Sequence, residues 1–154
     1  MTTPDENKEI VRRYYEDAFN EERTDLLDEL IAEDVVNHDP LSDDTLTADE
    51  ARGFEGFRRH VEVAHEGFPD AAVTIDEMIG EDDKVLVRFE FTGTHEGRFG
   101  GIEPTGERVS GSNMALFRIE DGKIVERWLE SDNLEMLQQL GVLPRTTKLV
   151  QGTA

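Results

Sequence analysis

The chain has 154 residues, with 36 acidic and 16 basic side chains, a formal net charge of −20 and no cysteine. A chain of this length buries roughly two thirds of its unfolded surface, so a single folded domain over residues 1–154 is expected without a disulfide or a metal. The lack of cysteine excludes cysteine nucleophiles, thiolate zinc sites and iron–sulfur clusters. The negative charge disfavours nucleic acid and anionic membranes as partners.

The sequence predicts no leader peptide and no membrane span. Residues 1–6 are acidic, and no uninterrupted apolar run reaches about 18 residues, so the cytoplasm is the simplest location. The acidic residues are dispersed, and only four basic residues are lysines. This pattern favours a salt-adapted protein, because concentrated salt screens the repulsion between carboxylates. An ordinary acidic cytosolic protein is the alternative.

The first predicted helix begins at Pro4. Thr3 offers an N-cap hydroxyl, and Glu6 stands where a capping box needs its acid. A stripe of apolar residues at helical spacing then predicts one buried face: Ile10, Val11, Tyr14, Tyr15, Ala18 and Phe19.

Two shorter helices are predicted next, separated by a loop. Thr24 can cap a helix that carries Leu26, Leu27, Leu30 and Ile31 and leads into an extended segment ending at Pro40. Residues 41–50 are polar and aperiodic, which predicts a surface loop. The third helix lies around residues 57–65 and stops at residues 67–70.

From residue 71 onward the apolar period changes to two, which predicts strands at residues 73–75, 85–91, 109–119 and 124–130. Short turns between them, including Asp121-Gly122, indicate antiparallel pairing. A final helix is expected over residues 133–140, with Gly141 as its C-cap. Helices before strands, without alternation, favour an α+β fold in which helices cover one face of a curved, mostly antiparallel sheet. A cavity between these two layers is the expected place for a ligand.

Several familiar sites are absent or improbable. No Walker or dinucleotide motif occurs, and the glycines between residues 97 and 106 predict a flexible loop. His60 and His65 are five residues apart, so they do not form a helical zinc pair. An iron site built from His38, Asp39 and His95 has nothing in the sequence to bring its ligands together.

The remaining candidates move protons without a cofactor: His38, His95, Asp132 and Arg88. A carboxylate suits general acid–base work when burial in an apolar pocket brings its pKa toward the working pH. Asp132 is the best candidate, although with Glu135 it also fits a capping box for the last helix. His38 could instead bond to the local turn, and His95 could lie on the surface or at the pocket rim.

Three residues are candidates for binding a substrate: Trp128, Asn113 and, in a second possible role, Arg88. Trp128 is a core residue or a ligand platform, since large aromatic side chains anchor sheets. Arg88 alternates with Val87 and Phe89, so it faces either solvent or the cavity.

An ordered set of segments between residues 7 and 143 resembles the SnoaL-like polyketide cyclase family. That family lies within the nuclear transport factor 2-like superfamily of cone-shaped α+β barrels. The resemblance is carried by Asn37-His38-Asp39-Pro40, Phe68-Pro69-Asp70, Gly93-Thr94-His95-Glu96-Gly97, Pro104-Thr105-Gly106, Asp121-Gly122-Lys123-Ile124-Val125-Glu126-Arg127-Trp128, Asp132 and Gln138-Gln139-Leu140-Gly141.

The resemblance implies an intramolecular aldol condensation without metal or organic cofactor. Asp132 matches the family's acid–base aspartate, and His38 and His95 match other polar positions of its motifs. A histidine or Arg88 is expected to stabilise the oxyanion. Because this scaffold hosts many functions, a ligand-binding or interaction module and a cofactor-free hydrolase or isomerase remain alternatives. The uncovered sheet face predicts a homodimer or a higher homo-oligomer.

Overall fold

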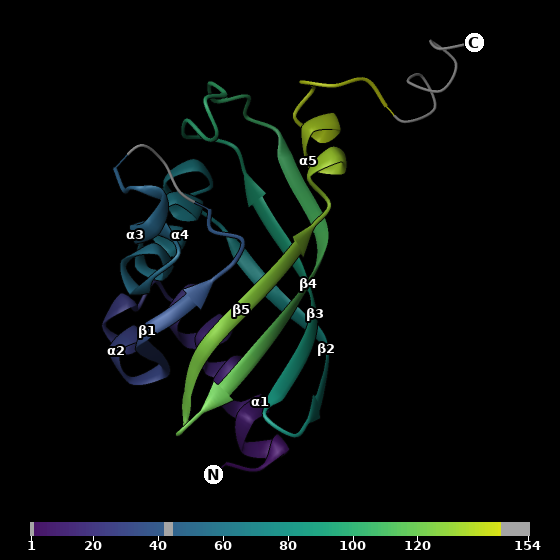
Figure 1. The fold of residues 1–154 in the computed structure, drawn as a ribbon. Coiled ribbons are helices and arrows are strands. Elements are labelled where there is room, and N and C mark those ends of the chain that lie inside the picture. Colours follow the sequence, from purple (N-terminus) through teal and green to yellow (C-terminus); the bar gives the residue numbers. More distant parts are fainter. Residues whose placement is uncertain (1, 42–44, 146–154) are drawn as a thin grey trace, which may run out of the picture.

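The computed structural model describes residues 2–41 and 45–145 and has the expected α+β architecture (Figure 1). One mixed five-stranded sheet has the order β1-β5-β4-β3-β2. Its strands are β1 (Ile31–Asn37), β2 (Ala72–Glu81), β3 (Lys84–Thr94), β4 (Arg108–Glu120) and β5 (Lys123–Ser131). All pairs are antiparallel except β1 with β5. The predicted mostly antiparallel sheet is therefore confirmed.

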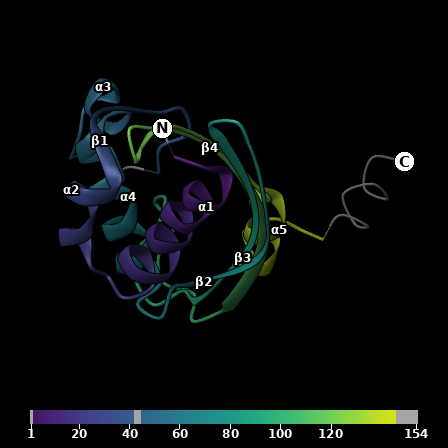
Figure 2. The same ribbon diagram turned by 90° about the horizontal axis from the view of Figure 1, so that it is seen from below.

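The first helical segment lies inside the curve of this sheet (Figure 2). The helix α1 (Pro4–Arg13) begins as predicted, with the Thr3 side chain accepting a hydrogen bond from the Glu6 backbone amide. It continues into a π-helical turn, η1 (Tyr14–Phe19), which ends where the Asn20 amide donates to the Tyr15 carbonyl. The Asn20 side chain then bonds both the amide and the carbonyl of Val73, which fastens this end of the segment to β2.

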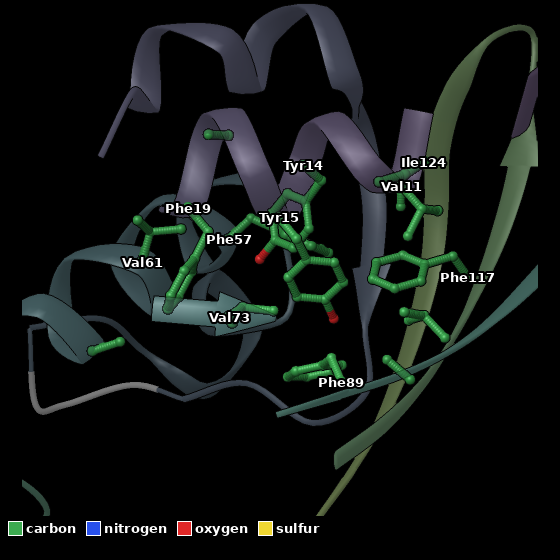
Figure 3. Close-up of a cluster of buried hydrophobic side chains, with 14 of the residues drawn as sticks. Val11, Tyr14, Tyr15, Phe19, Phe57, Val61, Val73, Phe89, Phe117 and Ile124 are labelled. Carbon is green, nitrogen blue, oxygen red and sulfur yellow. The ribbon is translucent and has the colours of Figure 1, made fainter. Parts of the chain in front are cut away.

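Aromatic side chains of this segment fill the concave side of the sheet (Figure 3). Tyr14 packs edge-on against Phe57, and Tyr15 packs against Phe89 and Phe117, with ring centroids 4.7–5.8 Å apart. The wider π-helical turn lets two adjacent tyrosines both point inward, and such turns are frequent at functional sites.

The next segment differs from the prediction in two places. A turn of 3-10 helix, η2 (Thr24–Leu26), and the helix α2 (Leu27–Leu30) end before Ile31, which opens β1 and pairs with Ile124. The predicted loop at residues 41–50 contains the start of a helix, α3 (Ala48–Ala51), while residues 42–44 lie outside the described part of the chain. The helix forms because Thr47 and Glu50 make a reciprocal capping box within this acidic stretch.

Two helices complete the fold. The predicted third helix is α4 (Phe54–Gly67), whose inner face packs on the core. The last helix, α5 (Asn133–Gln139), is tied to β4 by the Gln139 side chain, which bonds the amide and the carbonyl of Ser110. Gly141 follows it with φ +81°, as expected for a C-cap glycine. Within residues 2–41 and 45–145, no helix is long and apolar enough to cross a membrane.

Candidate functional site

A cavity of about 480 Å³ lies between η1, α4, the concave face of the sheet and α5. Most of its wall is apolar, and it includes Phe19, Phe89, Phe91, Phe99, Leu129 and Met136. Cavities of a few hundred cubic ångströms with apolar walls and a few polar groups are typical small-molecule sites. The cavity lies between the helices and the sheet, as the sequence predicts.

A buried arginine lies in the wall of this cavity. Arg127 on β5 is 1% exposed, and its Nε donates to Asn37 Oδ1 over 3.1 Å. Its Nη2 lies 3.4 Å from the Asp39 carbonyl oxygen and 3.5 Å from His60 Nδ1. Its guanidinium carbon lies 5.0 Å from the centroid of the Phe57 ring. All these contacts are to neutral groups.

His60 on α4 stands beside this arginine and lines the cavity. Its Nδ1 accepts a hydrogen bond from the Leu41 amide over 3.2 Å, which leaves the ring proton on Nε2. Burial lowers the pKa of His60 well below its ordinary value, and the charge of Arg127 lowers it further. His60 is therefore a neutral imidazole, and Arg127 carries the positive charge of this wall.

Two tyrosine hydroxyls next to this wall have no hydrogen-bond partner among the described residues. The oxygens of Tyr14 and Tyr15 are buried, and Tyr15 also lines the cavity. Burial raises the pKa of both phenols, and the charge of Arg127 opposes that rise. Both hydroxyls are therefore neutral, and that of Tyr15, which lines the cavity, is free to bond a ligand.

Asp132 and Asn113, two of the predicted site residues, line this cavity. Asp132 is exposed at its rim, where one carboxylate oxygen caps α5 by accepting from the Glu135 amide over 3.0 Å. Its other oxygen has no partner within the described residues. Asn113 is part of β4, and its side-chain nitrogen donates to the Gly111 carbonyl. The N-cap role of Asp132 is confirmed, and its carboxylate is exposed rather than buried in an apolar pocket.

The structure places His38 and Trp128 together on the outer face of the sheet, not among the residues that line the cavity. Their rings are stacked, with centroids 4.8 Å apart and planes 9° apart. His38 Nε2 lies 2.7 Å from a carboxylate oxygen of Glu126, and hydrogen bonds from His38 and then Arg118 lower the pKa of Glu126. Trp128 is thus neither a core residue nor a wall of the cavity, because its neighbour Arg127 takes the inward position on β5.

Arg88 also faces outward. Val87 and Phe89 point into the core, so the alternation of β3 turns Arg88 to the outer face, where it pairs with Asp76 over 3.8 Å. Of the two orientations that the sequence allowed, the structure therefore selects solvent.

His95 is neither at the surface nor at the rim, because the loop after β3 folds back over the end of α4. The amides of Glu96 and Gly97 both donate to the Gly67 carbonyl, and a Cβ on Gly97 would lie 1.9 Å from the Glu66 oxygen. His95 is fully buried beneath this loop, and its Nδ1 bonds Thr105.

Sequence reasoning missed the polar wall formed by Tyr15, His60 and Arg127. The helical spacing assigns Tyr15 to the core, and Arg127 enters only as part of a family motif, beside the more conspicuous Trp128. Strand alternation offered a signal, since an arginine on the same side as Leu129 must face inward when Leu129 does. Among the described residues, no group of three or more His, Asp or Glu side chains is arranged to hold a metal ion.

Comparison with known proteins agrees with this geometry. The sequence profile of the SnoaL-like polyketide cyclases matches residues 9–140. The chain belongs to the SnoaL-like polyketide cyclase family. It is 33% identical over 135 residues to the aklanonic acid methyl ester cyclase DauD of Streptomyces sp. (strain C5), covering 86% of this chain and 80% of that protein. It is 34% identical over 125 residues to the nogalonic acid methyl ester cyclase of Streptomyces nogalater, and the match covers 80% of this chain and 90% of that protein.

Solved structures place this member of the SnoaL-like family in the cone-shaped, nuclear transport factor 2-like fold. TsrD from Streptomyces laurentii superposes with a TM-score of 0.80 at 27% identity, covering 93% of this chain and all of that one. IdmH from Streptomyces antibioticus superposes with a TM-score of 0.74 at 34% identity, and the match covers 88% of this chain and 98% of IdmH. The cavity of this SnoaL-like chain is thus built on the scaffold that its sequence motifs predict.

Proposed function

We propose that this chain catalyses cofactor-free proton transfer and aldol chemistry on a small carbonyl compound bound in the cavity, with Asp132 as acid and base. One observation carries the proposal: a carboxylate with an uncommitted oxygen stands at the rim of a largely apolar cavity. Two relatives are by name cyclases of a methyl ester, that of aklanonic acid and that of nogalonic acid, which supports a carbonyl compound as the substrate of this chain.

The reaction balances without an external oxidant or reductant. The free oxygen of Asp132 removes a proton from a carbon next to a carbonyl group, and the electron pair left behind forms an enolate. The enolate carbon attacks a second carbonyl of the same molecule, which forms the new carbon–carbon bond and an alkoxide. Asp132 then returns its proton to the alkoxide. A substrate in the cavity displaces water from the rim and strengthens this exposed carboxylate as a base.

The test is deuterium exchange into a panel of 1,3-dicarbonyl and β-keto ester compounds, followed by NMR in molar salt. Asp132→Asn is the informative variant, because asparagine caps a helix as well as aspartate and so preserves α5. We expect exchange faster than buffer in the wild type and its loss in Asp132→Asn. Asp76→Asn, on the outer face, is the matched control and should exchange like the wild type.

Full exchange in Asp132→Asn would remove the basis of the proposal. No exchange with any compound would favour the second candidate, a non-enzymatic module that binds a small apolar ligand. That candidate draws support from one specific observation, since the Asp132 carboxylate already caps α5 and is exposed.

The outer face of the sheet supports a homodimer as part of the proposal. An apolar row crosses four strands in register, with Ile79 beside Leu86, Leu86 beside Leu116, and Leu116 beside Trp128. Ile79 is 56% exposed and Leu86 is 39% exposed, so the row is open in one copy of the chain. A second copy is the partner that a self-complementary apolar row suits. The acidic surface supports a working environment in a salt-rich cytoplasm.

A further inference from the structure

The positive charge of Arg127 is buried without a direct ion-pair partner among the described residues. Its guanidinium contacts an amide oxygen, a backbone carbonyl, an imidazole nitrogen and an aromatic ring, and within the described residues no carboxylate oxygen lies within 4.0 Å of it. Buried charges in proteins are ordinarily paired, because an unpaired one carries the full penalty of desolvation. An arginine in the wall of an open cavity can instead obtain its counter-charge from a ligand.

The groups around Arg127 that still lack partners are donors. Nη1 of Arg127 makes no hydrogen bond within the described residues, and the buried Nδ2 of Asn37 has none. The hydroxyl of Tyr15, on the same cavity, is also buried without a partner. His60 presents a neutral ring, because its Nδ1 accepts from the Leu41 amide. An excess of donors with one fixed positive charge is the arrangement that receives an oxyanion.

We propose that Arg127, aided by Tyr15, binds an oxyanion of the ligand, so that the cavity selects compounds with an enolate, phenolate or carboxylate oxygen on an apolar body. As a catalytic role this rests on the proposed function. The ligand then spans the cavity, with its anionic oxygen at Arg127 and its acidic carbon at the Asp132 rim. Arg127 then holds the enolate that Asp132 forms. It supplies the oxyanion stabilisation that the sequence suggested for Arg88.

The charge of the whole chain does not cancel this attraction. Three acids line the cavity, Asp39, Glu130 and Asp132, and all three are exposed to solvent like most of the net charge of −20. At the surface, in about 0.15 M salt, the Debye length is about 8 Å. Arg127 is 1% exposed, and its charge acts through a poorly polarisable wall in which salt does not screen it. Molar salt, which screens the surface further, should leave the preference for an anion intact.

The probe for this assignment is 4-nitrophenol, which has one shape and two charge states and is yellow only as its anion. Absorbance titrations with and without protein report how far binding shifts its ionisation. We expect the wild type to shift the ionisation of bound probe to lower pH by at least about one unit, which is a tenfold preference for the anion. Arg127→Gln should lose that preference, whereas Arg88→Gln, which removes an outward arginine, should keep it.

One further variant and one further measurement guard against misfolding. Tyr15→Phe breaks no hydrogen bond and should fold normally, yet it should lose part of the preference for the anion. Binding of the neutral phenol at low pH checks that the cavity of Arg127→Gln is intact. An unshifted ionisation in the wild type, an undiminished preference in Arg127→Gln or Tyr15→Phe, or no saturable binding by the wild type would each overturn the assignment.

This experiment is independent of the proton-transfer activity, because 4-nitrophenol offers no carbon acid to Asp132. Asp132→Asn should keep the anion preference or increase it, since it removes a negative charge from the rim. If deuterium exchange fails while the preference persists, the proposed reaction is wrong and the anion site stands.

Discussion

Gly56 is a position where the packing around a helix opposes the ordinary preference for alanine over glycine. It lies in the first turn of α4, where alanine is ordinarily the better helix former by about 1 kcal/mol. A Cβ at this position would lie 1.7 Å from the carbonyl oxygen of Ala51 and 2.3 Å from its carbonyl carbon. Both atoms are backbone at the end of α3, so no side chain can rotate away, and Gly56→Ala must force α3 and α4 apart.

The expected loss follows from two opposing contributions. Overpacking usually costs about 1–3 kcal/mol, and a clash with backbone belongs at the upper end of that range. The gain in helix propensity returns about 1 kcal/mol, so the free energy of unfolding should fall by about 2 kcal/mol. For a chain of this size, that corresponds to a fall of about 4–8 °C in the thermal midpoint.

Urea unfolding followed by circular dichroism at constant salt measures this change. Gly111→Ala is the control, because a Cβ there meets nothing within 4 Å, and its stability should stay equal or rise slightly. Equal or greater stability of Gly56→Ala would refute the reasoning. The displacement of α3 should also affect the cavity. The Arg52 carbonyl, which lies between α3 and α4, accepts a hydrogen bond from the Asn37 amide, and the Asn37 side chain accepts one from Arg127 in the cavity wall.

Three further predictions concern pH, salt and assembly. Burial and then Arg127 hold the pKa of His60 below its ordinary value of 6.5, so below that pH the unfolded chain takes up a proton that the native state refuses. Stability is therefore retained above pH 6.5 and lost as pH falls, by at most about 1.4 kcal/mol per pH unit for this group. His60→Asn, whose Oδ1 replaces the accepting Nδ1, should flatten the dependence of unfolding free energy on pH between 6.5 and 5.5, and equal slopes would contradict this. The thermal midpoint should rise from millimolar to molar salt, where the Debye length is about 3 Å, and indifference to salt would reject salt adaptation. Light scattering in molar salt should show a dimer that Leu86→Glu converts to a monomer and that the exposed control Leu134→Glu leaves unchanged; a monomeric wild type would reject the dimer.

Much of the fold follows from local pattern. The Thr3 cap, the change from helical to strand periodicity near residue 71 and the Asp121-Gly122 turn predict elements that the structure contains. Each of these signals depends on residues that are close in sequence, so its physical cause is local. The capping box of α3 is equally local, but the acidic, aperiodic residues around it predict a loop.

Less of the candidate site than of the fold follows from local pattern. The sequence by itself determined the family motifs, the N-cap at Asp132 and a cavity between helices and sheet. Only the tertiary structure decided which side of the sheet is inner, and that choice turned Arg127 to the cavity and left His38, Trp128 and Arg88 outside. It also folded the loop after β3 over His95. Strand alternation separates neighbours onto opposite faces, but which face is buried depends on long-range packing against α1, η1 and α4.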